Sequence, residues 1–290
     1  MEKIQLKRYG NNRTMELREH SNGLKYLVFP EFEKLGFVDH MFSTRIGGVS
    51  KGYWSECNLS YTRGDEKEAV DENYRRVSEA LGHGRSLDEF VLTFQTHTTN
   101  VKTVTEEDRG KGPAKARDYT DIDGLVTNVP GIILGTFHAD CPPVYFVDPV
   151  HKAIGLSHSG WKGTKGKIAQ KTIEKMKENY GTDPGDLFCA IGPSICGECY
   201  EIGSDVAEQF AEAFSEKELS EEKILLPDGN GKYHLFLWNA IKLTLLQSGV
   251  PNQQIIVTDV CTRCNPDYLF SHRIHGENRG NLCAFLSVRT

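Results

Sequence analysis

Between Phe90 and Ser157 the chain carries five short apolar runs with no convincing amphipathic helix among them. Runs of this length are typical of strands that are buried in a sheet. A regular alternation of strand and helix is therefore excluded for this stretch, and a mixed-sheet α/β or α+β core is favoured. The five predicted strands are Phe90–Phe94, Gly124–Thr127, Ile132–Phe137, Val144–Val147 and Ala153–Ser157.

The rest of the chain adds further strands and a small number of helices. Apolar spacing of three or four residues predicts helices over 70–81, 168–180, 206–214 and 238–245. No repeat or linker divides the sequence, so we expect one domain over residues 1–290, with surface insertions at Glu106–Thr120 and Ser215–Gly231. The additional strands are predicted at Tyr26–Phe29, Met41–Thr44, Leu187–Ile191, Ile255–Thr258 and Leu282–Val288.

The charge and hydropathy of the chain limit its partners. The formal net charge is -6, and a mildly acidic surface argues against broad binding to nucleic acid or to anionic membranes. The N-terminus lacks the apolar stretch of a secretory signal, and no window approaches the roughly 18 consecutive apolar residues of a membrane helix. We therefore expect a soluble cytoplasmic protein with no obligate protein partner, in which the eight cysteines stay reduced.

Three segments place a histidine or a cysteine directly after a predicted strand. The three residues are His97, Cys141 and His158. Two imidazoles and one thiolate suit zinc, and a catalytic zinc keeps three protein ligands and leaves the fourth position to water or substrate. Asp140 is placed to orient a ligand. The three residues are 44 and 17 positions apart, and this spacing alone does not establish a metal site. A single cysteine or histidine is often only a buried or hydrogen-bonded side chain.

Two further groups of residues leave alternatives open. His138, three residues before Cys141, competes as a ligand, or it points to the other face of its strand. The pairs Cys196–Cys199 and Cys261–Cys264 are separated by more than sixty residues, whereas a zinc ribbon has its pairs roughly 15–20 residues apart. The spacing favours incidental thiols, although the fold is able to bring the pairs together.

A third group offers polar side chains for a substrate. Ser43 and Arg45 precede adjacent glycines, which permit close approach of a ligand, and arginine binds phosphate with a planar fork. A glycine turn that carries a solvated arginine explains the same pattern. We take Ser43, Arg45, Gln95 and Arg273 as candidate substrate-binding residues. The candidate catalytic residues are Cys141, Asp140 and Arg45.

Taken together, these segments resemble the YfiH/YlmD family, which was long labelled as multicopper polyphenol oxidase or laccase-domain proteins. The resemblance covers about residues 35–290, and the order His97, Cys141, His158 matches the zinc ligands of the family. It rests on Phe42-Ser-Thr-Arg-x-Gly-Gly-Val-Ser50, Gln95-x-His97, Asp123-Gly-Leu-Val-Thr127, Ala139-Asp-Cys-x-Pro143, Asp148-Pro149, His158-x-Gly-Trp-x-Gly163, Ile191-Gly-Pro193 and Phe270-Ser-x-Arg273.

The resemblance implies an α/β sandwich of mixed β-sheets flanked by helices, and a zinc-dependent purine nucleoside enzyme. Family members are associated with phosphorolysis of adenosine, inosine, guanosine and methylthioadenosine, and with deamination of adenosine. The expected substrates are therefore purine nucleosides and phosphate. The chain departs from the family pattern at a few positions, which bear on the substrate preference and on the anion site near Arg273. These positions are Thr98, His138, Ser194, Arg263 and Ile274.

Rival functions follow from the same residues. Copper-dependent polyphenol oxidation would use His₂Cys with a weak axial Met, but no methionine lies in a short Cys–His–Met loop, so any copper is expected to be adventitious. A cysteine hydrolase or amidase would use Cys141 as nucleophile and His158 as base. A metal-stabilised binding protein without catalysis is the remaining alternative.

Overall fold

Two six-stranded mixed sheets form the centre of the protein. The computed structural model describes residues 5–10, 13–82 and 86–290. The first sheet has the order β1 (Glu16–Glu19), β2 (Lys25–Val28), β3 (Val38–Ser43), β15 (Leu282–Val288), β7 (Ile133–His138) and β4 (Phe90–Leu92). The second has the order β14 (Ile255–Val257), β10 (Phe188–Ile191), β8 (Pro143–Asp148), β9 (Ala153–His158), β6 (Gly124–Thr127) and β5 (Val101–Thr103).

Both sheets combine antiparallel and parallel pairs. The pairs β4–β7, β5–β6 and β10–β14 are parallel, whereas β8–β9 and β3–β15 are antiparallel. This arrangement confirms the predicted α/β fold with mixed sheets and no regular winding. All ten predicted strands are present, while β1 and β5 were not predicted because they are short and only partly buried.

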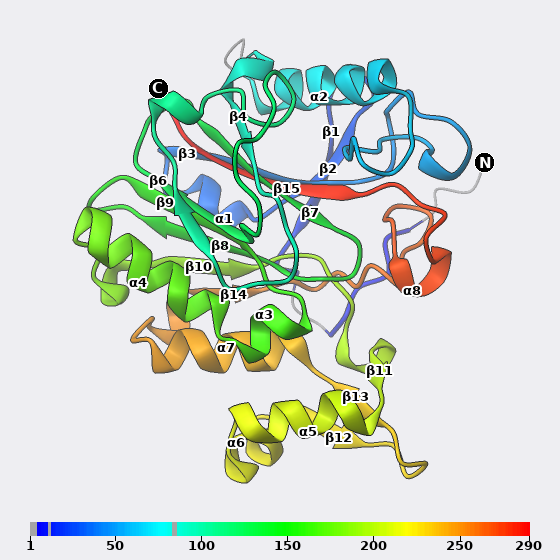
Figure 1. Ribbon diagram of the computed structural model, residues 1–290, viewed down its shortest axis with the longest axis vertical. Helices are drawn as coiled ribbons and strands as arrows, with labels where there is room; N and C mark the ends of the chain where they lie inside the picture. The colour runs from blue at the N-terminus through cyan, green and yellow to red at the C-terminus, as the bar shows by residue number, and fades with distance from the viewer. Residues whose placement is uncertain (1–4, 11–12, 83–85) are drawn as a thin grey trace.

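The two sheets stack face to face with helices on the outer faces (Figure 1). Helix α2 (Lys67–Leu81) covers the first sheet, and α4 (Ile168–Tyr180) and α7 (Leu237–Gln247) cover the second. The predicted helices over 70–81, 168–180 and 238–245 are therefore confirmed. Three short helices complete the main body: α1 (Pro30–Glu33), α3 (Trp161–Lys165) and α8 (His272–His275).

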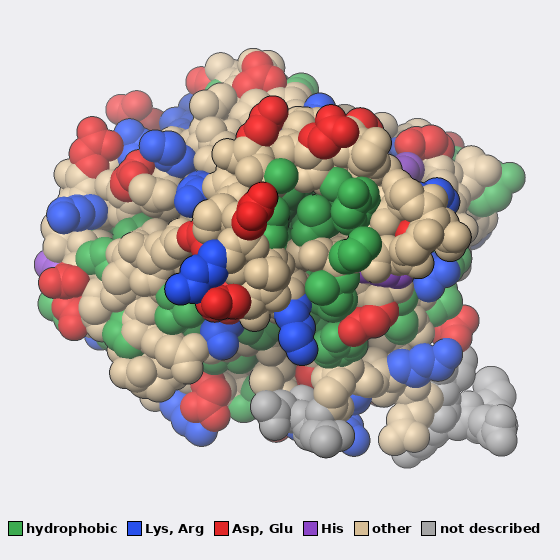
Figure 2. Space-filling model, turned by 90° about the horizontal axis from the view of Figure 1, so that it is seen from below, with side chains coloured by type: hydrophobic (Ala, Val, Ile, Leu, Met, Phe, Trp, Pro, Cys, Tyr) green, Lys and Arg blue, Asp and Glu red, His purple; other side chains and the backbone are tan. Residues whose placement is uncertain are grey.

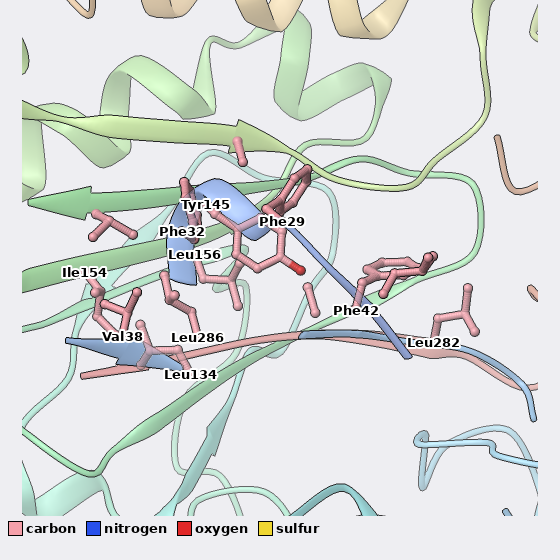
Figure 3. Close-up of a cluster of buried hydrophobic side chains, with 14 of the residues drawn as sticks. Phe29, Phe32, Val38, Phe42, Leu134, Tyr145, Ile154, Leu156, Leu282 and Leu286 are labelled. Carbon is pink, nitrogen blue, oxygen red and sulfur yellow. The ribbon is translucent and has the colours of Figure 1, made fainter. Parts of the chain in front are cut away.

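Apolar side chains from both sheets fill the layer between them (Figure 3). Strand β15 shows why these strands have continuous apolar sequences. Its residues Leu282 and Leu286 point into this layer, while Phe285, between them, packs under α2 with Tyr74. Because both faces of the strand are buried, the alternation of apolar and polar residues disappears.

A small lobe projects from the main body at the bottom of Figure 1. It contains the sheet β11 (Glu201–Ile202), β13 (Tyr233–Leu235) and β12 (Leu225–Pro227), with α5 (Ser204–Ala213) and α6 (Glu216–Glu221). The lobe has its own apolar cluster around Phe210 and Leu235. The segment predicted as an irregular insertion, Ser215–Gly231, instead begins with α6, because Ser215 and Glu218 form a reciprocal capping box.

The surface agrees with the modest net charge. On the face shown in Figure 2, the acidic and basic side chains that can be described are interspersed over the surface. Within the described ranges, no helix is both long enough and apolar enough to cross a membrane. The cytoplasmic location, the single domain and the lack of an obligate partner stay predictions.

Candidate metal centre and its cavity

The side chains of His97, Cys141 and His158 converge at one end of the second sheet. Their ligand atoms all lie within 4.8 Å of one another. The register of the β8–β9 hairpin explains why Cys141 and His158 are close together. Pro143 pairs with His158, and Cys141 is two residues before Pro143. The hairpin thus brings Cys141 beside the end of β9, while His97 arrives on a separate loop after β4.

Asp123 joins His158 to the loop that carries His97. Its carboxylate accepts a hydrogen bond from Nδ1 of His158 at 2.8 Å, so Nε2 of that ring is free to face Cys141. The same carboxylate accepts the backbone N–H groups of Thr96, His97 and Thr98 at 3.1, 3.1 and 2.9 Å. One buried side chain therefore orients one histidine ligand and fixes the loop that carries the other. Sequence reasoning missed this role, although Asp123 lies in a quoted motif.

Backbone conformation at two residues makes the convergence possible. His97 has a φ of 66°, a left-handed conformation that non-glycine residues rarely adopt. Gly160 lies directly against the three ligands. A Cβ atom on Gly160 would stand 2.9 Å from the His97 ring, 3.0 Å from Sγ of Cys141 and 3.4 Å from the His158 ring. Only a glycine leaves room there for three side chains to share one ion.

The charges of the site favour a thiolate between two histidines. Burial by itself raises the pKa of Cys141, but His158 and then His97 outweigh burial and lower this pKa to about 6. Burial lowers the pKa of His158, yet Cys141 and Asp123 raise it to about 9. Burial likewise raises the pKa of Asp123, but the hydrogen bonds from His158 and the loop amides hold it below its ordinary value. Thiolate and imidazole are the ligands that zinc prefers.

His138 is a support for the site rather than a fourth ligand. Its Nδ1 donates to the carbonyl of Cys141 at 2.9 Å, and its Nε2 accepts from the hydroxyl of Thr136 at 2.7 Å. Burial lowers the pKa of His138 well below its ordinary value, so the ring is neutral. Because both nitrogens are occupied, His138 holds the Cys141 backbone in place and does not compete for the ion.

Asp140 also has its oxygens occupied. They accept hydrogen bonds from Oγ1 of Thr262 at 2.5 Å, from Oγ of Ser271 at 3.0 Å and from the backbone amide of Arg273 at 2.7 Å. Asp140 is 8% exposed and has a φ of 87°. These contacts tie the turn that carries Cys141 to the C-terminal segments, which favours the predicted orienting role over proton transfer.

A cavity of about 630 Å³ opens in front of the three ligands. This volume lies within the range of small-molecule sites. Its lining includes the aromatic side chains of Phe94, Trp161 and Tyr200 and four arginines. The four arginines are Arg63, Arg117, Arg273 and Arg279.

Arg279 differs from the other three arginines because it is buried and incompletely hydrogen-bonded. It is 6% exposed, and its Nε has no hydrogen-bond partner. Burial, and then repulsion from Arg63, lower its pKa to about 10. Its Nη1 donates to the carbonyl of Gly280 and to Oδ1 of Asn281. Two cations side by side at the wall of a cavity favour the binding of an anion there. The sequence contains Arg279 but gives no sign that it is buried and unpaired.

The predicted substrate-binding residues divide into two groups. Gln95 and Arg273 line the cavity, but Gln95 pairs with the backbone of Phe137 and the Arg273 guanidinium donates to the carbonyl of Glu201. Ser43 and Arg45 are not among the lining residues.

Contacts with the protein itself account for Ser43 and Arg45. The hydroxyl of Ser43 is fully buried and accepts the amide of Cys283 at 2.9 Å. The Arg45 guanidinium donates to the carbonyls of Ser55 and Pro266 and packs over Phe270. The geometry therefore gives no support to phosphate binding by Ser43 and Arg45.

The two Cys-x-x-Cys pairs come together outside the cavity. The sulfur atoms of Cys196, Cys199, Cys261 and Cys264 lie within 4.8 Å of one another. The fold therefore closes a gap of more than sixty residues, which the spacing had left open, and the role of the four thiols stays a prediction. None of the four lines the cavity.

Comparison with known proteins decides the family. The family described as multi-copper polyphenol oxidoreductase laccase matches residues 39–289, which is most of the chain. The chain belongs to this family. Its members include the YlmD and YfiH proteins, so the resemblance predicted from the motifs is confirmed.

Individual relatives of the laccase-domain family carry different names. A protein of Geobacillus stearothermophilus named purine nucleoside phosphorylase YlmD is 35% identical over 85% of this chain and 89% of its own. A protein from an unknown prokaryote named adenosine deaminase RL5 is 33% identical over 86% of this chain and 96% of its own. The crystal structure of the hypothetical protein YfiH from Bacillus licheniformis superposes with a TM-score of 0.85 at 30% identity, covering 94% of this chain and 99% of that one.

Proposed function

We propose that this laccase-domain protein is a zinc-dependent purine nucleoside enzyme that cleaves nucleosides with phosphate and also deaminates adenosine. The single observation that carries the proposal is the open three-ligand centre of His97, Cys141 and His158 at the wall of a cavity with aromatic and cationic side chains. The names of the relatives, which include both activities, support the same pair of reactions.

The residues at the centre fit zinc. Two imidazoles and a thiolate are a common donor set for it, and three protein ligands leave one position for substrate or water. When bound, zinc supplies a Lewis acid and lowers the pKa of water that it holds. Asp123 sets the tautomer of His158, as second partners of metal-binding histidines generally do.

The cavity offers separate places for a base and for phosphate. Planar aromatic side chains such as Trp161 and Tyr200 provide faces on which a purine stacks. Arg279 and Arg63, which both line the cavity and repel one another, provide the positive charge for an anion site. We therefore assign phosphate binding to Arg279 and Arg63 in place of Ser43 and Arg45.

The chemistry of phosphorolysis then requires positioning more than a protein nucleophile. A phosphate oxygen forms a bond to C1′ of the ribose while the bond from C1′ to N9 breaks, and the electron pair of that bond leaves with the purine, which takes up a proton. Arg279 holds the phosphate and the aromatic walls hold the base, so that the reacting atoms meet in a fixed geometry. Deamination replaces the C6 amino group by oxygen from water and releases ammonia.

Copper-dependent phenol oxidation has less support than nucleoside chemistry. A type 1 copper site has His₂Cys with a weak axial ligand, commonly Met. Among the described residues that line the cavity there is no methionine. Met41 and Met176 are buried in apolar clusters, and Met15 accepts a hydrogen bond from Thr258.

A cysteine hydrolase is the second candidate, because one observation favours it. Asp123, His158 and Cys141 form a chain of contacts that resembles the orienting acid, base and nucleophile of a catalytic triad. A second imidazole, that of His97, lies within 4.8 Å of the same sulfur, which a metal centre requires and a cysteine nucleophile does not. Full activity after chelation, with covalent trapping at Cys141, would establish this candidate.

The proposed function is tested with protein purified under reducing conditions without added metal. Metal content is measured, and inosine and adenosine are each supplied with and without phosphate. Hypoxanthine from inosine only when phosphate is present supports phosphorolysis, and inosine with ammonia from adenosine supports deamination. Protein that carries zinc at the centre and converts neither nucleoside would refute the proposed function.

A further inference from the structure

The cluster of Cys196, Cys199, Cys261 and Cys264 is separate from the site described above. All four sulfur atoms lie within 4.8 Å of one another, with Cys196 and Cys261 buried and the other two partly exposed. The remaining cysteines outside the metal centre, Cys57, Cys189 and Cys283, are buried in the apolar core.

Strand order explains how two distant pairs meet. Strands β10 and β14 are parallel neighbours in the second sheet, with Ile191 opposite Val257. Their carboxyl ends lie side by side, so the loops that follow them meet at one edge of the sheet. The first cysteine of each pair follows its strand closely: Cys196 is five residues after the end of β10, and Cys261 is four residues after the end of β14. The bridge between Ser194 and Cys261 continues the pairing into the two loops.

The local geometry is that of a metal-binding turn pair. The backbone amide of Cys196 donates to Sγ of Cys261 at 3.2 Å, and the Arg263 guanidinium donates to Sγ of Cys199 at 3.3 Å. Such donors stabilise thiolates and balance their charge. Cys196 also precedes a short 3₁₀ turn, Gly197–Cys199, that folds the first pair back on itself.

The spacing of the sulfurs selects the kind of group that fits. Four sulfurs bound to zinc at about 2.3 Å stand about 3.8 Å apart at the corners of a tetrahedron. The distance from Cys199 to Cys264 is 3.5 Å, close to this value. It is longer than the roughly 2.05 Å of a disulfide. An iron–sulfur cluster places several iron atoms between its cysteines and needs a wider opening.

We propose that Cys196, Cys199, Cys261 and Cys264 bind one structural zinc ion. Four thiolates complete the coordination shell, so the ion has no position for a substrate. It joins the loop after β10 to the loop after β14. These loops also support the catalytic side of the molecule, because Ile195 donates its amide to the Asp140 carbonyl and Thr262 donates its hydroxyl to the Asp140 carboxylate.

The experiment is a count of zinc per chain in protein purified with a reductant and without added metal. Cys264→Ser is compared with Cys189→Ala, a matched control that removes a thiol from β10 outside the cluster. The zinc content is expected to fall by one ion per chain in Cys264→Ser and to stay unchanged in Cys189→Ala. An equal zinc content in wild type, Cys264→Ser and the control would overturn the proposal.

A second measurement keeps the proposal testable if Cys264→Ser fails to fold. Wild-type protein and His97→Ala are loaded with Co²⁺, and the intense sulfur-to-cobalt absorption of four-thiolate coordination is recorded. Its retention in His97→Ala supports a site that is independent of the cavity. Absence of this absorption in both proteins, or two disulfides found by mass spectrometry in reductant-purified chain, would overturn the proposal.

Discussion

The two clusters of metal-ligating side chains differ in how many ligands they supply and in what lies in front of them. The centre of His97, Cys141 and His158 has three ligands and faces a cavity of about 630 Å³. The cluster of Cys196, Cys199, Cys261 and Cys264 has four and lies outside that cavity. The comparison teaches that one sheet can place a three-ligand group facing a cavity and a four-thiol group away from it at the ends of adjacent strands.

The supports of the two sites also differ. A buried carboxylate, Asp123, orients a ligand in the open centre, and a neutral histidine, His138, holds its backbone. The four-cysteine cluster depends on the parallel pairing of β10 and β14 and on backbone donors. Removing a ligand should therefore abolish activity in the first case, while in the second it should chiefly loosen the fold.

The largest effect is expected from His97→Ala. Because the proposed zinc ion would contribute several kcal/mol to the transition state, kcat/KM for phosphate-dependent cleavage of inosine should fall on the order of 10³-fold or more. The side chain is exposed on a loop, so the thermal midpoint should change little. Steady-state kinetics and a metal count on the same sample check this prediction. Unchanged kinetics in a variant that has lost one metal ion per chain would show that the three-ligand centre is not needed for the activity.

A smaller loss is expected from Asp123→Asn. The amide would present N–H groups to the donors of His158 and the 96–98 loop, so metal affinity and activity should each fall about 10–100-fold. Asp121→Asn is the matched control, since Asp121 is exposed and its carboxylate accepts the hydroxyls of Thr96 and Thr120. Its backbone carbonyl, which the substitution keeps, accepts the side chains of Thr98 and Asn100. Competition titration with a zinc chelator measures the affinity. Equal affinities in the two variants would show that Asp123 does not position the ligands.

Arg279→Gln is expected to raise the KM for phosphate about 10–100-fold, with a smaller change in the KM for inosine. The reason is the loss of a buried cation whose Nε is unpaired. Arg117→Gln serves as the control because its guanidinium already donates to the Thr93 carbonyl and packs over Phe94. A parallel rise in both KM values for Arg279→Gln would point to damage of the whole cavity.

A separate effect concerns the stability of the fold in acid. His40 is buried, its Nε2 accepts the Phe29 amide at 2.8 Å, and burial lowers its pKa to about 3. The unfolded chain binds a proton at the ordinary value of 6.5, so stability is lost as pH falls from 6.5 toward 3, by about 1.4 kcal/mol per pH unit.

His40→Gln should flatten this dependence without changing the pH at which zinc leaves either site. Denaturant unfolding at several pH values, with zinc release recorded in parallel, makes the comparison. An identical pH slope in both proteins would mean that His40 does not set the acid stability of the fold.

The sequence predicted most strands and the order of the three ligands because both are local properties. An apolar run identifies a strand, and His97, Cys141 and His158 each follow one. Local patterns do not contain strand order. The meeting of the cysteine pairs follows from the parallel neighbours β10 and β14.

Side-chain environment was equally beyond sequence reasoning. The role of Asp123 follows from the pairing of β6 with β9, which sets Gly124 opposite Ser157. Arg45 and Arg279 look alike in sequence, yet Arg45 lies outside the cavity and donates to the carbonyls of Ser55 and Pro266, whereas Arg279 lines the cavity and its Nε has no partner. Only the packed structure shows which of the two arginines lines the cavity.

The most direct measurement is hypoxanthine release from inosine, with and without phosphate, by zinc-loaded wild type and by His97→Ala. The account predicts phosphate-dependent release by wild type, with ribose 1-phosphate formed in equal amount, and its near-complete loss in the variant. Release at the wild-type rate by His97→Ala, or none from wild type with zinc at the open centre, would contradict it.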